Sequence, residues 1–382
     1  MKKLLAVLLL AGCVQGVDAQ DNEKFLENKT LFEEITGVKK KTDKFNLYLN
    51  MNMSYDAMDG YSDPVKNKFN VRQLRIEAKG NVNDWLSYRW RQRLNRSNAQ
   101  GNNIDNAPTS IDIAGIGVKL SDKWSIFAGK QCANYGGIEF DLNPIEIYEY
   151  SDMIDYMSNF MTGLNIGYDF AAGQQLNFQV LNSLNGTFAE TYGDVEYAEA
   201  SKTPLVYTLN WNGNFNNVFK TRWSASIMNQ AKGEKMTYFA LGNELSLGKF
   251  GMFLDFMYSK EDIDRKGIMT GILGSDYNVS GAEYMSIVTK LNYRFTPNWN
   301  VFVKGMYETA SLDKEVGEFE DGKYRTSLGY FAGLEYYPME NSNLHFFLTY
   351  VGRKYNYTDK IALKDFDTNR VSVGFIYQLQ MF

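Results

Sequence analysis

The sequence predicts an all-β fold, a transmembrane antiparallel β-barrel of sixteen strands with one long loop folded inward. Three observations predict it: an N-terminus typical of secreted proteins, sixteen segments in which apolar and polar residues alternate, and connections that alternate between short and long. Alternation with a period of two indicates β-strands whose two faces meet different surroundings. Short turns opposite long loops are typical of outer-membrane barrels.

The N-terminal region predicts export from the cytoplasm. A basic MKK start precedes the apolar stretch 4–11, and VDA at 17–19 supplies small residues for cleavage. We therefore expect a signal peptide at 1–19, a periplasmic leader at 20–43 and the barrel domain at 44–382. The alternative is a lipoprotein signal, with lipid attached to Cys13 of LAGC. The charged leader is interpreted as a mobile segment, with a plug or docking helix as the alternative.

The composition agrees with this fold and excludes several classes of protein. Aromatic residues make up 15% of the chain, and 32 Gly stand against 6 Pro, which suits strands joined by tight turns. The net charge of −5 argues against a nucleic-acid partner. The mean hydropathy of −0.38 would suit a soluble protein, but barrel strands are only half apolar. Once the signal is removed, Cys132 is the only cysteine, so no internal disulfide is expected.

The strand segments follow one another without a linker that would divide the chain. The first, FNLYLNMNMSY at 45–55, places Phe45, Leu47 and Leu49 on one face and asparagines on the other. The other fifteen are expected at 69–79, 84–95, 110–120, 123–131, 160–170, 174–184, 204–212, 217–230, 235–246, 249–260, 282–295, 298–310, 325–337, 343–356 and 370–382. Sixteen is an even number, as bacterial barrels require.

The connections between these segments are sorted by length. The short ones lie at 80–83, 121–122, 171–173, 213–216, 248, 296–297 and 339–342. The long ones lie at 96–109, 132–159, 183–204, 261–281, 311–324 and 356–369, and the connection at 231–234 is short where a long one is expected. A soluble β-sandwich has no reason to sort its loops in this way, so the pattern favours a membrane barrel.

The segment DWLSYRWRQRLN at 84–95 shows which face lines the lumen. Leu86, Tyr88 and Trp90 share one parity, and arginines occupy the other. An arginine that faces lipid at mid-bilayer costs about 2–4 kcal/mol, so three in one strand must face inward. We call Arg89, Arg91 and Arg93 the arginine ladder. The same parity test predicts these pore-lining basic residues: Arg75, Arg89, Arg91, Arg93, Lys220, Arg222, Lys290, Arg294 and Lys304.

Arg72 does not fit this parity. The apolar positions change face between Val71 and Leu74, which indicates a β-bulge. Each single basic residue could also be a solvated lumen residue that balances a nearby carboxylate. As a group, these residues are expected to set the potential of the pore.

The longest connection, 132–159, is rich in Ile and Tyr and contains no Lys or Arg. Loops of this length are usually functional. We expect it to fold into the barrel after the fifth strand, with its carboxylates facing the arginine ladder across the water path. The alternative is an acidic surface loop. Its acidic residues are Glu139, Asp141, Glu146, Glu149, Asp152 and Asp155.

Catalysis finds little support in the sequence. His345 is the only histidine, so a site with paired histidines is excluded, and neither a cofactor nor a metal is expected. The parity of its strand directs His345 into the lumen, whereas a barrel hydrolase that acts on lipid would need a base facing the membrane. We interpret His345 as a structural residue and Cys132 as a small packed residue.

The chain resembles the phosphate-selective porin O/P family, in its Bacteroidetes branch. The resemblance rests on segment 69–95, with Arg72, Arg75, Gly80, Trp85 and Tyr88, and on AGK at 128–130 followed by GGIE at 136–139. It implies a sixteen-stranded porin, forming homotrimers in outer-membrane lipid, that passes small anionic solutes such as phosphate. The family's phosphate binders combine an arginine ladder with lysines at the constriction. Here the ladder is present, but the long loop offers six acids and no lysine.

The sequence therefore predicts an outer-membrane diffusion porin for ions and small hydrophilic solutes. Preference for anions or phosphate and a general pore with a transverse field both remain open. The alternatives from other classes are a non-conducting barrel used for surface binding or adhesion and an outer-membrane hydrolase.

Overall fold

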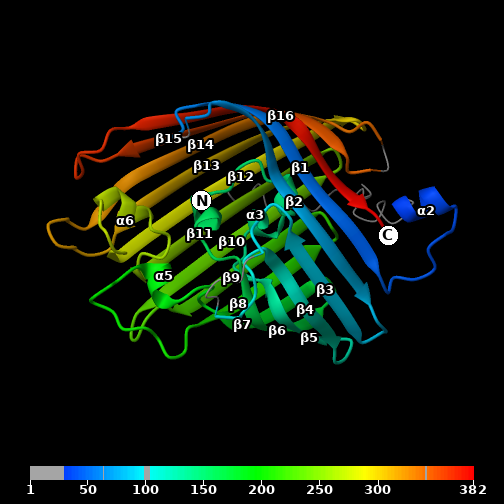
Figure 1. The fold of residues 1–382 in the computed structure, drawn as a ribbon, viewed down its shortest axis with the longest axis horizontal. Helices are drawn as coiled ribbons and strands as arrows, with labels where there is room; N and C mark the ends of the chain where they lie inside the picture. Colours follow the sequence, from blue (N-terminus) through cyan, green and yellow to red (C-terminus); the bar gives the residue numbers. More distant parts are fainter. Residues whose placement is uncertain (1–29, 63, 99–103, 340–341) are drawn as a thin grey trace, which may run out of the picture.

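A computed structural model describes residues 30–62, 64–98, 104–339 and 342–382. Sixteen antiparallel strands form one closed barrel, in which each strand pairs with its neighbours in sequence and β1 pairs with β16 (Figure 1). Closure leaves no strand edge unpaired, which is the condition for a sheet to cross a membrane. The predicted signal peptide falls outside the described residues.

The strands are β1 (Asn46–Asp59), β2 (Asn67–Asn81), β3 (Leu86–Arg93), β4 (Ile111–Lys119), β5 (Trp124–Cys132), β6 (Phe160–Ala171), β7 (Gln174–Asn182), β8 (Leu205–Phe215), β9 (Phe219–Asn229), β10 (Lys235–Leu247), β11 (Phe250–Ile263), β12 (Ser280–Thr296), β13 (Trp299–Leu312), β14 (Gly322–Tyr336), β15 (His345–Tyr357) and β16 (Phe366–Gln380). The helices are α2 (Leu31–Thr36), α3 (Ile138–Asp141), the 3-10 turn η3 (Pro144–Glu146), α4 (Asp152–Asp155), α5 (Phe188–Tyr192) and α6 (Ile268–Leu273).

These bounds confirm the predicted sixteen strands, each within a few residues. The short connections gather at one end of the barrel, on the right of Figure 1, and the long connections with α5 and α6 at the other. Only two residues join β6 to β7 and β10 to β11, whereas 22 residues separate β7 from β8. The predicted short connection between β9 and β10 is also present.

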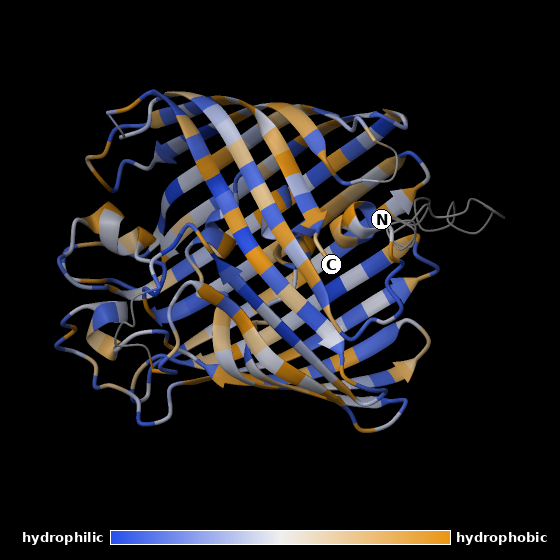
Figure 2. Cartoon of the chain, turned by 45° about the vertical axis from the view of Figure 1, so that its right-hand side comes forward, coloured by the Kyte–Doolittle hydropathy of each residue, from blue (hydrophilic) through white to orange (hydrophobic). Residues whose placement is uncertain are grey.

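The two faces of the wall differ as the alternation predicts (Figure 2). The outer face exposes apolar side chains along most strands, among them Ile227, Leu348 and Val373. The inner face buries polar ones, such as Asn52, Thr208 and Ser327. In the part of the chain that the structure describes, no helix is long and apolar enough to cross a membrane.

The register shifts at five strand pairs, and at two of them a β-bulge has a charged residue as its single extra residue. On β2, Gln73 pairs with Asn52 and Val71 pairs with Met53, so Arg72 is an extra residue, as the change of parity predicted. On β4, Ile113 pairs with Arg91 and Ile111 pairs with Gln92, so Asp112 is the extra residue. A bulge changes the direction of a side chain relative to regular alternation.

Helix α2 lies against the end of the last strand. Thr30 and Glu33 form a capping box at its start, which satisfies backbone N–H groups that have no partner within the helix. The backbone N–H of Phe32 donates to the carbonyl of Met381 at 3.0 Å. The rings of Phe32 and Phe382 lie 4.8 Å apart, so part of the predicted leader docks on the turn end of the barrel.

Candidate functional site

The connection between β5 and β6, residues 133–159, folds into the barrel, and we call it the inner loop. It carries α3, η3 and α4. Helix α3 contacts β10 and β11, η3 contacts β1, β2 and β16, and α4 contacts β12. Because these strands stand on opposite sides of the barrel, the loop crosses the lumen, and its predicted inward fold is confirmed.

Two glycines and one buried carboxylate fix the start of the inner loop. Gly136 and Gly137 have φ angles of 76° and 88°, a region that glycine adopts without strain. A Cβ atom at Gly136 would lie 2.6 Å from the hydroxyl of Ser224. The carboxylate of Asp255 accepts hydrogen bonds from the backbone N–H groups of Ile138 at 2.7 Å and Glu139 at 2.8 Å. The GGIE motif is therefore bound to the wall.

The acidic residues of the inner loop form ion pairs with basic residues of the wall. Glu139 pairs with Lys304 and Asp141 with Arg222. Glu149 contacts Arg370 at 2.7 Å.

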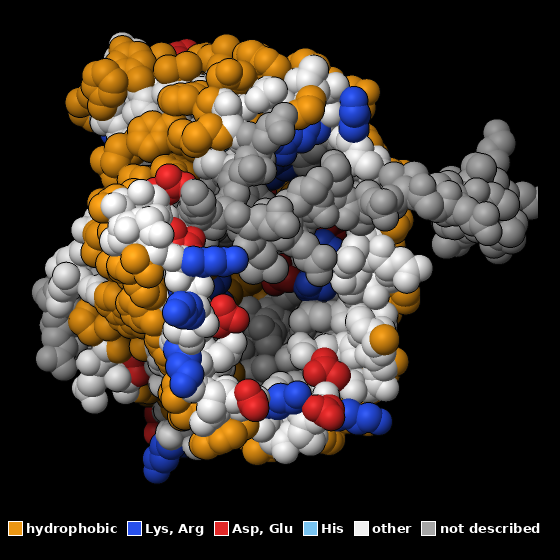
Figure 3. Space-filling view, turned by 90° about the vertical axis from the view of Figure 1, so that its right-hand side faces the viewer, with side chains coloured by type: hydrophobic (Ala, Val, Ile, Leu, Met, Phe, Trp, Pro, Cys, Tyr) orange, Lys and Arg blue, Asp and Glu red, His pale blue; other side chains and the backbone are white. Residues whose placement is uncertain are grey.

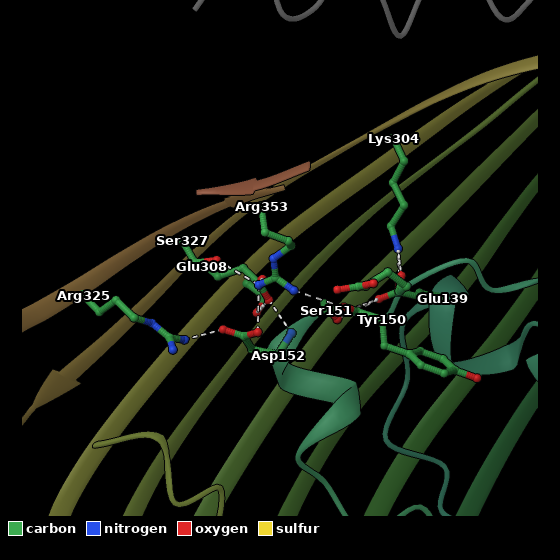
Figure 4. A network of polar contacts seen from close by, with 11 residues as sticks. Glu139, Tyr150, Ser151, Asp152, Lys304, Glu308, Arg325, Ser327 and Arg353 are labelled. Carbon is green, nitrogen blue, oxygen red and sulfur yellow. Dashed lines mark hydrogen bonds and ion pairs between the residues drawn. The ribbon is translucent and has the colours of Figure 1, made fainter. Parts of the chain in front are cut away.

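The remaining contacts meet around Asp152 (Figure 4). Asp152 pairs with Arg325, and also with Arg353 at 2.8 Å. Arg353 in turn contacts Glu308 at 2.6 Å. The carboxylate of Glu308 also accepts the backbone N–H of Asp152 at 2.7 Å. The loop network is Glu139, Asp152, Lys304, Glu308, Arg325 and Arg353, and all its members are buried.

Glu146 and Asp155 have weaker contacts. Glu146 lies 3.9 Å from Nε2 of His345. Burial raises the pKa of Glu146 above its ordinary value, while His345 opposes that rise and Glu335 adds to it. Asp155 is exposed and, among the described residues, has no ion-pair partner. It is the loop carboxylate whose charge is least neutralised.

The expectation that the loop carboxylates face the arginine ladder is wrong for Glu139, Asp141, Glu149 and Asp152. They pair instead with basic residues of other strands, on β9 and β13–β16. Arg325, Arg353 and Arg370 were not among the predicted pore-lining residues. The parity of their strands could have identified all three, since Arg325 and Arg353 share a face with buried Ser327 and Val351, and Arg370 with Ser372.

The arginine ladder faces the lumen and is bound to its own wall. Arg89 contacts Glu77 at 2.8 Å. Around the bulged Asp112, Arg93 approaches to 2.6 Å, Arg75 to 2.8 Å and Arg91 to 3.3 Å. We call these four residues the Asp112 cluster. Three guanidinium groups share one carboxylate, so the cluster keeps an excess of positive charge.

Two aromatic side chains flank this cluster. The ring of Phe160 lies 5.2 Å from the guanidinium of Arg91 and 5.5 Å from that of Arg93. Tyr150, from the inner loop, points away from the loop network in Figure 4 and is close enough to feel the charge of the cluster's three arginines. The loop thus turns an uncharged phenol toward the arginines, while four of its carboxylates pair with basic residues of other strands.

The other predicted basic residues are dispersed along the lumen. Lys220 pairs with Glu244 at 2.8 Å. Lys290 stands opposite Lys304 and lies 4.5 Å from the ring centre of Phe302. Arg294 is exposed near a short turn, where its Nε donates to the carbonyl of Pro297 at 3.0 Å. The structure therefore does not bring the predicted set together at a single point.

Figure 3 views the barrel from its turn end. Lys, Arg, Asp and Glu side chains gather around a hollow at the turn end of the barrel, and hydrophobic side chains cover its outer surface. A polar hollow enclosed by an apolar exterior is the arrangement of an aqueous pore in a membrane.

His345 is packed into the wall. Its ring is 1% exposed, stacks on Tyr337 at 4.6 Å, and has Nδ1 2.8 Å from the carbonyl of Asn343. The described residues include no group of three or more His, Cys, Asp and Glu side chains that could hold a metal ion.

A family model described as "Phosphate-selective porin O and P" matches residues 45–379, nearly the whole barrel. The chain belongs to this family. It is an outer-membrane diffusion porin of bacteria, the class of protein that the closed barrel and the loop-crossed lumen define. A comparison with curated proteins found no match.

Solved structures share the fold at low sequence identity. The outer-membrane channel DcaP of Acinetobacter baumannii is 13% identical with a TM-score of 0.59, over 87% of this chain and 96% of that one. OmpT of Vibrio cholerae is 11% identical with a TM-score of 0.55, over 89% and 99%. An anion-selective porin from Comamonas acidovorans is 9% identical with a TM-score of 0.54, over 88% and 99%.

Proposed function

We propose that this porin prefers anions, and that the Asp112 cluster and the arginine ladder set the preference. One observation carries the proposal: three arginines share the single carboxylate of Asp112, while four loop carboxylates are engaged by basic residues of other strands. The ladder charge is therefore not cancelled across the water path. An unbalanced row of fixed positive charges attracts anions and repels cations.

The reversal potential in a KCl gradient tests this proposal in planar bilayers. The double variant Arg91→Ala/Arg93→Ala is expected to lower the chloride-to-potassium permeability ratio severalfold. Lys232→Ala is the matched control, because Lys232 is exposed on a loop and pairs there with Glu199. The proposal fails if both variants keep the ratio of the unmodified protein.

We propose that phosphate is among the anions that pass through the pore. The family description and the guanidinium groups, which bind phosphate in a bidentate manner, support it. Conductance in sodium phosphate and sodium chloride of equal ionic strength distinguishes a phosphate preference from a general anion pore. Saturation of the current at low phosphate, but not at low chloride, is the expected result.

The predicted acidic residues are assigned a different role from the one their position first suggested. We propose that Glu139, Asp141, Glu149 and Asp152 anchor the inner loop, and that Asp155 projects an unpaired charge into the path. Asp155→Asn is then expected to raise anion preference without loss of stability. An unchanged reversal potential in this variant would remove Asp155 from the path.

Several features of the whole chain belong to the same proposal. We propose that residues 1–19 are removed as a signal peptide, that the leader 20–43 stays in the periplasm, and that the barrel forms homotrimers in outer-membrane lipid without catalytic activity. One of the matched OmpT structures is described as a trimer form. The intact mass of the purified protein checks the first point, since cleavage after Ala19 leaves Gln20 at the N-terminus, whereas lipidation would retain Cys13.

A further inference from the structure

The connection between β9 and β10 is the shortest at the loop end, the end of the barrel that carries the long connections. It has five residues, 230–234, whereas the other connections at that end have seven or more. The last part of the connection between β7 and β8 lies against it. Ala200 forms a β-bridge with Ala231, and the backbone N–H of Lys232 donates to the carbonyl of Glu199 at 2.8 Å. The two connections leave a cavity of about 370 Å³ between them, which we call the rim pocket.

The rim pocket lies on the outer face of the barrel. Alternate residues of a strand share a face, and so do directly paired residues of neighbouring strands. Ile227 is exposed on the outer face and pairs with Tyr207 on β8 and with Thr237 on β10. Two residues further along, Asn229 pairs with Lys235, and both line the pocket. Their side chains therefore point away from the lumen, and a solute in the pore does not meet them.

The pocket lies at the level of the lipid head groups. β10 runs from Lys235 to Leu247 over 13 residues. For a strand tilted by about 40° this corresponds to roughly 30 Å of height, whereas the apolar band of such barrels is about 25 Å tall. The rings of Phe215 and Phe219 lie 5.9 Å apart at the turn end, where aromatic residues mark the membrane interface, and Phe219 pairs with Leu245. Lys235 and the pocket therefore lie beyond the opposite edge of the band, on the side of the long loops.

An apolar surface lies directly beside the pocket, toward the middle of the membrane. Tyr207, Leu209, Ile227 and Phe239 are all exposed there, on the outer face of β8, β9 and β10. A lipid whose head group occupies the pocket can lay an acyl chain on this surface, and the burial of apolar area favours that contact. A soluble ligand in the same pocket would gain nothing from it. The surroundings of the pocket therefore favour a lipid.

The pocket combines positive charge with hydrogen-bond acceptors. Its charged and amide side chains are Lys202, Lys232, Lys235, Glu199, Glu234 and Asn229. Lys232 pairs with Glu199 at 2.7 Å, whereas Lys202 and Lys235 have no ion-pair partner in the described part of the chain. Lysine binds phosphate as a point charge, and carboxylate and amide oxygens accept hydrogen bonds from hydroxyl groups. The two carboxylates disfavour a ligand that carries negative charge alone. A phosphorylated sugar matches both kinds of group.

We propose that the rim pocket binds a lipid of the outer leaflet whose head group is a phosphorylated sugar. Lys202 and Lys235 contact the phosphate. The carboxylate of Glu234 accepts hydrogen bonds from sugar hydroxyls, and an acyl chain lies on the outer face of β8–β10. The site is separate from the pore, so this proposal goes beyond the passage of solutes and does not depend on it.

Retention of lipid A, an acylated and phosphorylated glucosamine disaccharide, tests the proposal. The detergent-purified porin is mixed with lipid A, and the bound lipid is counted by native mass spectrometry. Lys202→Gln/Lys235→Gln is expected to retain severalfold less lipid A than the unmodified protein. Lys323→Gln/Lys354→Gln is the matched control, since both lysines are exposed at the loop end of β14 and β15, away from the pocket. Equal retention by the two double variants would overturn the proposal.

A cavity-filling variant separates the pocket from the general charge of the surface. Ser201 lines the pocket, so Ser201→Trp places a ring in the cavity and keeps every charge. This variant is expected to retain as little lipid A as Lys202→Gln/Lys235→Gln. Unchanged retention would mean that the lipid does not enter the cavity, and the proposal would be rejected. The heat-induced mobility shift on SDS gels shows that each variant is folded.

Two further probes identify the chemistry of the ligand. Glucosamine 1-phosphate, which has no acyl chain, is expected to leave lipid A bound at millimolar concentration. Its displacement of lipid A would assign the pocket to a free sugar phosphate in place of a lipid. Phosphatidylglycerol, which has a phosphate and no sugar ring, is expected to be retained severalfold less than lipid A. Equal retention of the two lipids would contradict recognition of a sugar.

The pore supplies a readout that the proposed lipid site should not change. Because Lys202 and Lys235 lie outside the lumen, Lys202→Gln/Lys235→Gln is expected to keep the conductance and reversal potential of the unmodified protein. A conducting variant that has lost lipid A supports the lipid site. A conducting variant that retains lipid A fully refutes the lipid site alone and leaves the porin function standing.

Discussion

Asp112 controls how much of the ladder charge the lumen presents. It lies in a β-bulge, so its carboxylate joins Arg75, Arg91 and Arg93 at a position where regular alternation would turn it outward. A second carboxylate there would neutralise most of the positive charge of the cluster. Without any carboxylate, the three guanidinium groups would repel one another. A single carboxylate holds them together and leaves positive charge for the solute.

The variant Asp112→Asn should therefore raise anion preference while it weakens the wall. Removing one negative charge beside the path changes the energy of a monovalent ion at a partly hydrated site by about 1 kcal/mol, or roughly fivefold in the permeability of that ion. The reversal potential should move in the direction opposite to that of Arg91→Ala/Arg93→Ala. A shift of both variants in the same direction would contradict the role assigned to the cluster.

Arg353 is the residue on which the anchoring of the inner loop most depends. It is 3% exposed and contacts Asp152 of the loop and Glu308 of β13. Arg353→Met would leave two carboxylates close together without this cation, and breaking a buried ion pair in this way costs about 3–5 kcal/mol. We expect a lower unfolding temperature and noisier single-channel currents, because the loop then has alternative positions.

The matched control for this experiment is Lys360→Met. Lys360 lies in the connection between β15 and β16, where it is 3.9 Å from the carboxylate of exposed Glu320 and donates to the backbone carbonyl of Asp321. Such surface pairs contribute little to stability, so the unfolding temperature and the current noise should match those of the unmodified protein. If the current noise of Arg353→Met equalled that of the unmodified protein, the remaining contacts would suffice to hold the loop.

At the scale of the element, β5 shows how closely the short strands pack. Gly129 has a φ of 125°, and a Cβ atom there would lie 2.3 Å from the carbonyl oxygen of Ala114 on β4. Gly129→Ala is expected to destabilise the barrel by more than 1 kcal/mol, because both the backbone angle and the contact oppose a side chain. The heat-induced mobility shift on SDS gels measures the loss.

Gly251→Ala on β11 is the control for this substitution. The nearest atom to its added Cβ would lie 4.0 Å away, and its φ is not in the positive region. The thermal midpoint should therefore change little. If the two variants unfolded at the same temperature, the close approach of β4 and β5 would not limit stability.

The strands were predictable because apolar and polar side chains have to alternate along a strand of a membrane barrel. Lipid on one side and water on the other impose the period of two, so β16 could be identified from Val371, Val373 and Phe375 alone. The bulge at Arg72 was visible as a break in that period. The bulge at Asp112 was missed, because the isoleucines change parity between Ile113 and Ile116 across two small residues, Ala114 and Gly115, which mark neither face clearly.

The inner loop illustrates what alternation cannot reveal. Its inward fold followed from its length and its apolar residues, but the direction of its carboxylates depends on which walls it reaches. That direction is decided by long-range pairs such as Asp152–Arg353 and Glu149–Arg370, which join residues about 200 positions apart in the chain. No local pattern contains this information, so the loop was placed correctly and its charges were assigned to the wrong wall.

At the scale of the whole molecule, the barrel separates its charges into two walls. The wall of β13–β16 has its cations matched by the carboxylates of the inner loop, whereas the ladder of β3 is matched only in part by Glu77 and Asp112. Selectivity by such a wall acts through an electrostatic potential that extends into water. Dissolved salt must therefore weaken it.

We expect the permeability ratio for anions over cations to fall as the ionic strength rises. The Debye length is about 10 Å at 0.1 M and about 3 Å at 1 M, and the ladder from Arg89 to Arg93 spans roughly 13 Å. At 0.1 M the arginines act on a passing ion together, and at 1 M each acts only at contact. Reversal potentials at a fixed gradient, repeated from 0.1 M to 1 M KCl, measure this change. A ratio independent of salt would mean that ions are selected by direct binding, and the ladder would then act as a row of discrete sites instead of a shared field.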